Sequence, residues 1–411
     1  MQADMSTSTA FTVPTSRQLV WLALALSIGA ALSLGITRFS YALLLPPMRA
    51  DLGWSYTLAG AMNTVNALGY LLGALITPRL LQRFGASKVL MAGAVLASIF
   101  MGLSGFFTAS TSLLLQRLLA GVASAFVFIA GGLLAARLGA LDPARGGFLI
   151  GLYYGGTGLG IVLSAFLVPW VLEAAQHLPH AWAWAWWVLS LVCVAFTGLL
   201  WWPAKVLMSM SMVAKVGPDT SDVFKWRVFG FSLAGYTMFG VGYIGYMTFV
   251  IALLREQGAQ AGEITLFYAL LGVSVLLSPR LWAGLLDRFK GGQVLALLSA
   301  LLGLATILPA LTSALPLLLL SGVVFGGVFL SLVASTTALV RHNLPQSAWG
   351  AGISAFTIVF AAGQIVGPTV VGWIADGPGG LARGLVFSAC ALWLGAALAS
   401  RQRALPRPQL T

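Results

Sequence analysis

Two arginines, Arg38 and Arg117, lie inside long apolar stretches of the chain. A guanidinium stays charged at every working pH and presents five N–H donors in a planar fork that matches a carboxylate. Within a membrane such a group costs at least ~2.5–3.5 kcal/mol, so it rarely faces lipid and is a candidate functional group. The chemistry that these two residues favour is the capture of an anion away from bulk water.

The acidic residues sharpen this interpretation, because none of them is expected beside the two arginines. All ten fall in a tail, in a loop or at the end of an apolar stretch. They are Asp4, Asp51, Asp142, Glu173, Asp219, Asp222, Glu256, Glu263, Asp287 and Asp376. Buried cations without a carboxylate partner repel each other and are poorly solvated, and an anionic ligand would relieve both costs. In the alternative interpretation, Arg117 bonds backbone carbonyls or polar side chains, and Arg38 reaches toward outer water.

Other polar and aromatic side chains are predicted to line the same site. Asn63, Asn66 and Tyr70 follow one another at i, i+3 and i+7, which places them on one helical face. For any single one of these side chains, the alternative is a hydrogen bond between helices, worth ~0.6 kcal/mol. The predicted substrate-binding set is Arg38, Arg117, Tyr41, Asn63, Asn66, Tyr70, Tyr153, Tyr154, Tyr236, Tyr243, Tyr246, Tyr268 and Gln364.

The composition indicates that membrane helices must position these residues. Of the 411 residues, 59% are hydrophobic and 8% are charged, against roughly a quarter charged in a soluble domain. This excludes a water-soluble enzyme, a secreted disulfide scaffold and a disordered protein. Twelve apolar stretches are each long enough to cross a bilayer, which predicts an all-α integral membrane protein with twelve transmembrane helices. They cover residues 19–47, 55–77, 87–108, 111–137, 146–171, 182–203, 227–254, 262–285, 292–311, 314–340, 348–374 and 382–400.

The basic residues predict the orientation of these spans. The net charge is +12, and seventeen of the 22 Lys and Arg fall on the side that carries both termini, against three on the other side. This bias predicts cytoplasmic termini and a cytoplasmic linker. Because the basic residues are scattered between apolar runs, they do not indicate a nucleic-acid site.

An internal repeat divides the predicted bundle. Shifting the chain by 205 residues brings 80-LLQRFGASKVL-90 over 285-LLDRFKGGQVL-295, with six identities in eleven positions. The same shift pairs glycines and tyrosines along most of both halves, which indicates two six-helix halves of parallel topology. The predicted organisation is a cytoplasmic tail at 1–18, a first half at 19–203, a linker at 204–224, a second half at 225–400 and a tail at 401–411.

These motifs resemble those of a known transporter superfamily. The loops QRFGASK at 82–88 and DRFKGG at 287–292 resemble the acidic-basic-x-Gly-basic-basic loop of the major facilitator superfamily, although Gln82 replaces the usual Asp in the first copy. RLLAGVASA at 117–125 resembles its Arg-x-x-x-Gly pattern, and GITRFSYALLLPPM at 35–48 resembles the first span of the bacterial YbfB/YjiJ-type group. The resemblance implies a substrate site between the halves, and an inner-side latch that includes Arg83, Asp287 and Arg288.

Together these features predict a secondary active transporter that moves a small organic anion by alternating access, in a bacterial inner membrane. The alternative is efflux of amphipathic drugs or metabolites. The sequence contains no nucleotide-binding loop of the G-x-x-x-x-G-K-[ST] type, so we do not expect the chain to hydrolyse ATP. We expect no enzymatic activity, no cofactor and no bound metal, and we expect a monomer whose partners are the lipid bilayer and one small solute.

Overall fold

The computed structural model describes residues 15–142, 144–210, 225–345 and 348–405. Its helices fold into twelve candidate membrane spans, as predicted. Within the described residues there are no strands, as expected where no water can pair with an open sheet edge. The helices are α1 (Ser16–Ala30), the π-helix η1 (Ala31–Ile36), α2 (Tyr41–Leu52), α3 (Tyr56–Phe84), α4 (Ala86–Ser104), α5 (Ser110–Leu141), α6 (Gly146–Ala174), α7 (Ala181–Met210), the 3₁₀ turn η3 (Trp226–Phe229), α8 (Gly230–Glu256), α9 (Ala261–Arg288), α10 (Gln293–Leu311), α11 (Leu315–Asn343), α12 (Trp349–Ala375) and α13 (Gly380–Ser400).

Many of the helices run further than the apolar stretches that predicted them. The helix α5 continues past Arg137 to Leu141, and α7 continues past Lys205 to Met210. Hydropathy marks only the part of a helix inside the hydrocarbon layer, whereas the backbone hydrogen bonds continue into the polar interface.

The first span departs from the predicted uninterrupted helix. Between α1 and α2, the amides of Thr37 and Phe39 donate five residues back, to the carbonyls of Leu32 and Leu34, and residues 37–40 form a turn. The span therefore contains a π-helical segment followed by a break, and Arg38 lies in that break. Such π-helical insertions are often found at functional sites.

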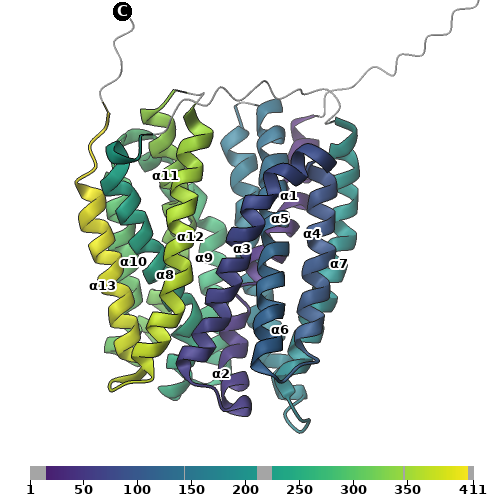
Figure 1. The fold of residues 1–411 in the computed structure, drawn as a ribbon, viewed down its shortest axis with the longest axis vertical. Helices are drawn as coiled ribbons and strands as arrows, with labels where there is room; N and C mark the ends of the chain where they lie inside the picture. Colours follow the sequence, from purple (N-terminus) through teal and green to yellow (C-terminus); the bar gives the residue numbers. More distant parts are fainter. Residues whose placement is uncertain (1–14, 143, 211–224, 346–347, 406–411) are drawn as a thin grey trace, which may run out of the picture.

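The helices form two six-span bundles that lie side by side (Figure 1). We call the described residues 15–210 the N half and 225–405 the C half. In both halves, glycines bring the first span against the fifth. A Cβ at Gly35 would lie 2.6 Å from Cα of Gly160, and a Cβ at Gly240 would lie 3.2 Å from Cα of Gly363. Small residues permit this close approach of backbones.

The two halves meet mainly along α3 with α12 and α6 with α9, and α2 also packs on α8. Thr64 Oγ1 donates to the carbonyl of Ile365 at 2.8 Å, and Asn63 Nδ2 donates to Thr248 Oγ1 at 2.8 Å. Glycines again allow the close contact, because a Cβ at Gly158 would lie 2.3 Å from the carbonyl oxygen of Gly272. The N half and the C half are thus in direct polar contact.

Candidate functional site

The break in the first span frees backbone carbonyls beside Arg38. Around the break, Ser40 donates to Ile36, and Ala42 and Leu43 donate only three residues back, to Phe39 and Ser40. The amide of Tyr41, four residues on, does not donate to the carbonyl of Thr37, so the helix leaves this carbonyl unused. It accepts instead from Arg117 Nη1 at 2.8 Å. The carbonyl of Phe39 also accepts from the hydroxyl of Tyr268, in the C half, at 2.6 Å. The residue before Arg38 is therefore bonded within the N half, and the residue after it is bonded to the C half.

Arg38 itself connects the two halves. Its side chain is 3% exposed, and its Nη2 donates to Oε1 of Gln364 on α12 at 2.5 Å. The ring of Tyr70 lies 5.9 Å from the guanidinium carbon. The buried Nε has no hydrogen-bond partner. A buried guanidinium with an unused donor and one neutral oxygen partner is incompletely satisfied.

Arg117 lies in a different environment, entirely within the N half. It is 2% exposed and donates to the Thr37 carbonyl and, at 2.7 Å, to Oδ1 of Asn63. The rings of Tyr41 and Trp186 lie 4.9 Å and 5.9 Å from its guanidinium carbon. The Nε of Arg117, like that of Arg38, has no hydrogen-bond partner, but Arg117 has two oxygen acceptors where Arg38 has one. These neutral oxygens and the aromatic faces stabilise the charge. The arrangement agrees with the alternative interpretation for Arg117, in which it holds helices together.

No carboxylate balances these charges within the part of the chain that the structure describes. The described acids lie at helix ends or beyond them. The ion pair between His180 and Asp51 includes neither Arg38 nor Arg117. Arg38 and Arg117 are close enough for their charges to interact. Of the ten acids, Asp4, Asp219 and Asp222 lie outside the described residues. The described site is therefore a positively charged interior with neutral surroundings.

Four of the predicted tyrosines use their hydroxyls to fasten helices together. They bond backbone carbonyls or a serine: Tyr41 to Ala59, Tyr153 to Phe128, Tyr246 to Ser321 and Tyr268 to Phe39. Tyr236 lies close to Thr336 on α11. Asn66 donates to the backbone carbonyl of Arg117 at 3.0 Å. These contacts match the interhelical role that the sequence left open for each side chain.

The hydroxyls of Tyr70, Tyr154 and Tyr243 have no hydrogen-bond partner among the described residues. Tyr70 and Tyr243 lie near enough to Arg38 for an electrostatic interaction, and Tyr154 interacts with Tyr70 in the same way. Of the predicted set, the structure therefore brings Arg38, Gln364, Tyr70, Tyr154 and Tyr243 together with unused hydrogen-bonding capacity.

An aromatic array on the C half escaped the sequence analysis. It consists of Tyr236, Phe239, Tyr243, Phe329 and Phe360, and its near-parallel rings have centroids 4.8–5.5 Å apart at 10–27°. Phe39, next to Arg38, meets Phe329 edge-on at 5.7 Å. The sequence analysis placed the tyrosines of α8 in the predicted site. It did not identify Phe239, Phe329 and Phe360, because scattered phenylalanines are ordinary in an apolar chain.

A second cluster joins the halves at the start of α3, at the face opposite the chain termini. The Asp376 carboxylate accepts from the backbone amides of Tyr56 and Thr57 and from Thr57 Oγ1, at 2.6–2.8 Å. The hydroxyl of Tyr56 donates to Glu256, and Arg49 lies over the Tyr56 ring at 3.7 Å. Partial burial alone would raise the pKa of Asp376, but these hydrogen bonds and nearby Arg49 hold it below its ordinary value. We call these five residues the outer cluster.

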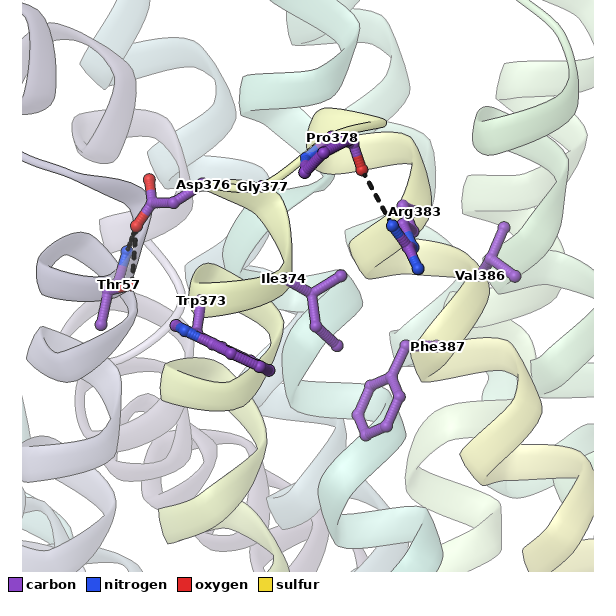
Figure 2. Close-up of a pocket in the computed structure, with 9 residues that line it drawn as sticks. All are labelled: Thr57, Trp373, Ile374, Asp376, Gly377, Pro378, Arg383, Val386 and Phe387. Carbon is purple, nitrogen blue, oxygen red and sulfur yellow. Dashed lines mark hydrogen bonds between the residues drawn. The ribbon is translucent and has the colours of Figure 1, made fainter.

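A pocket of about 600 Å³ lies beside the outer cluster, between α3, α12 and α13 (Figure 2). Trp373, Ile374 and Phe387 form its apolar wall, and Arg383 donates to the Pro378 carbonyl at 3.3 Å. None of its lining residues belongs to the predicted substrate-binding set. Its one carboxylate, Asp376, is already hydrogen-bonded to α3, and the pocket shares no lining residue with the site around Arg38.

The three predicted gating residues are exposed. The guanidinium of Arg83 lies 5.2 Å from the ring of Phe84, and that of Arg288 lies 5.7 Å from the ring of Phe289. Within the described ranges, these two arginines and Asp287 form no ion pair with one another. The structure therefore does not bring the gating residues together.

The fold is shared by two solved structures of membrane transporters. A bacterial homolog of the human lysosomal transporter Spinster, inward-facing and unoccupied, is 14% identical over 94% of this chain and 97% of that chain, with a TM-score of 0.69. The nucleoside transporter NupG is 14% identical over 93% and 98%, with a TM-score of 0.72.

Sequence similarity gives the particular family. Residues 30–400 match the family described as uncharacterised MFS-type transporter YbfB, and the chain belongs to this family. No curated protein matches the chain in sequence. The match begins within α1 and ends with α13, so it includes Arg38, Arg117 and Gln364.

Proposed function

We propose that this protein is a secondary active transporter for a small organic anion, and that Arg38 binds the anionic group of the solute. One observation carries the proposal: a buried guanidinium between the two halves has an unused Nε and only a neutral oxygen, that of Gln364, as its hydrogen-bond partner. An anion at this position would supply the missing charge and acceptors.

Alternating access would occur by movement of the half at 19–203 against the half at 225–400, with 204–224 as the linker. The outer cluster supports this proposal, because its hydrogen bonds join α3 to the end of α12 at the face opposite the chain termini. Opening that side requires breaking them. The exposed residues Arg83, Asp287 and Arg288 would then form the latch of the opposite state, in which the face that carries the termini closes.

The proposed setting is a bacterial inner membrane with both termini in the cytoplasm and the transporter acting as a monomer. The excess of Lys and Arg beside the chain termini supports this orientation. A gradient of ions or of a second solute would drive transport. Because no described carboxylate lies beside Arg38, solute exchange, or proton movement on the solute itself, is favoured over a membrane-centred proton carrier.

Efflux of amphipathic drugs or metabolites is the second candidate function. The aromatic array supports it, because flat apolar rings bind lipophilic solutes of either charge. The solved neighbour NupG is a nucleoside transporter, which adds uncharged planar solutes to this alternative. The unpartnered Arg38 disfavours a cationic solute.

A thermal-stability screen of the purified protein distinguishes these functions. The panel contains carboxylates, sulfonates, nucleosides and lipophilic cations at equal concentration. We expect anions to raise the melting temperature, and Arg38→Gln to abolish the response. The matched control is Arg145→Gln, at an exposed position before α6. A response to cations or nucleosides alone contradicts the proposal.

A further inference from the structure

We propose that the transported anion is a planar aromatic carboxylate, with its carboxylate on Arg38 and its ring against the aromatic array. This inference rests on the proposed function and narrows it to one substrate class. It is carried by the Nε–Nη2 edge of Arg38, where Nε has no partner and Nη2 has one neutral partner, and by the near-parallel rings of the array.

The edge of Arg38 that carries Nε and Nη2 fits a carboxylate. Nε and Nη2 lie on the same edge of a guanidinium and can donate in parallel to two oxygens. Here Nε is buried without a partner, while Nη2 is held by the single neutral oxygen of Gln364. A carboxylate that displaces this oxygen accepts from both donors at once. The release of Gln364 would also remove a hydrogen bond between the halves.

The array provides a surface for a flat ring. Tyr243 belongs to the array and also lies within electrostatic reach of Arg38, so the charged and aromatic parts of the site adjoin. The rings of Phe239, Tyr243 and Phe360 are tilted by only 10–26° from one another. A ligand ring can continue this offset stacking, which contributes beyond the burial of apolar area.

The neutral surroundings disfavour an amino group on the same ligand. The unpartnered hydroxyls of Tyr70, Tyr154 and Tyr243 can bond ring substituents or a carboxylate oxygen. No described carboxylate is available for an ammonium, so an aromatic amino acid would bury an uncompensated cation. The site therefore favours an aromatic acid over the amino acid with the same skeleton.

The test is a binding titration of the full-length protein in detergent with four probes of similar size. They are 3-phenylpropanoate, 3-cyclohexylpropanoate, 3-phenylpropanamide and L-phenylalanine. We expect 3-phenylpropanoate to bind about three- to tenfold more tightly than its cyclohexyl analogue. The amide and the amino acid should bind at least tenfold more weakly. The cyclohexyl probe controls for apolar area, because its saturated ring cannot stack.

Two variants locate the preference. Phe360→Leu should reduce the ratio between the phenyl and cyclohexyl probes to below about twofold, whereas Phe267→Leu should leave it unchanged. Phe267 is the matched control, because it is fully buried in the C half but does not belong to the array. An equal effect of both variants on the ratio overturns the assignment to the array.

The outcomes separate this inference from the proposed function. If both carboxylates bind equally and the amide does not, the aromatic preference is wrong and the anion site stands. If the amide binds as well as 3-phenylpropanoate, or if no carboxylate binds, the proposed function fails together with the inference.

Discussion

The two halves of the molecule share a backbone plan and differ in the chemistry that they bring to their interface. In each half the first span packs on the fifth through a pair of glycines, Gly35 with Gly160 and Gly240 with Gly363. At the repeat spacing of 205 residues, the position of Arg38 in the N half is taken by Tyr243 in the C half. The N half contributes the charged guanidiniums, and the C half contributes the Gln364 amide and the stacked rings.

The same position also differs in backbone structure. The first span of the N half is broken around Arg38, whereas α8 runs as one helix through Tyr243. The repeat therefore determines how closely helices approach, and departures from the repeat determine which groups are free to bind a ligand. If Arg38 binds the solute as proposed, substitutions on one side of the site would change the solute while the other side keeps its packing.

Replacing Arg38 should have the largest effect on binding. Arg38→Gln removes the charge and the fork, and we expect the affinity for 3-phenylpropanoate to fall by about 10- to 100-fold, equivalent to about 1.5–3 kcal/mol. Arg38→Lys, which keeps the charge without the fork, should fall in between. Calorimetric titration of both variants measures this. An unchanged affinity of Arg38→Gln for 3-phenylpropanoate would show that Arg38 does not bind the carboxylate.

Replacing Arg117 should mainly lower stability. Arg117→Ala leaves the Thr37 carbonyl and Asn63 Oδ1 without their donor, and we expect the free energy of unfolding to fall by about 2–3 kcal/mol. The exposed control Arg145→Ala should change it by less than about 0.5 kcal/mol. Denaturant unfolding in detergent reports both values. If Arg117→Ala retains stability but loses solute binding, the two arginines have the opposite division of roles.

The shared packing can be tested with matched glycine variants. Gly35→Ala and Gly240→Ala each place a methyl group 2.5–2.6 Å from a backbone oxygen, so each should destabilise the protein by about 1–3 kcal/mol. Gly198→Ala has open space and should be neutral or slightly stabilising. Melting temperatures compare the three. A loss confined to one half would refute equivalent packing.

The outer cluster should give the smallest effect. Asp376→Asn replaces a carboxylate that accepts three hydrogen bonds from α3, and because the site is partly exposed we expect a loss of only ~0.5 kcal/mol. A lowered carboxyl pKa contributes stability above the ordinary value and loses it as the pH falls below about 4. The melting-temperature difference from wild type should therefore be constant between pH 5 and 8.

Asp142→Asn is the control for this last variant, because Asp142 accepts one exposed hydrogen bond within the N half. It should not lower the melting temperature. A difference between wild type and Asp376→Asn that changes between pH 5 and 8 would show that another group titrates with the outer cluster.

The sequence predicted the twelve spans because hydropathy reports directly on burial in lipid. It also predicted that Arg38 and Arg117 would be buried, since their cost in lipid is large. The sequence did not distinguish the roles of Arg38 and Arg117, because those roles depend on which backbone carbonyls are free to accept a hydrogen bond. No proline at residues 37–40 indicates the break, because Pro46 and Pro47 lie later, in α2. The pairing of Arg38 with Gln364, 326 positions away, follows from how the halves meet.

The π-helical segment in the first span also makes the length of that stretch critical. Each residue turns an α-helix by about 100°. Deleting one residue between Ala31 and Ile36 would restore an ordinary helical turn and rotate everything that follows relative to α1. Arg38 would then point away from α12. An insertion or deletion here should thus abolish recognition while leaving a chain that still enters the membrane, whereas similar changes in the loops should be tolerated.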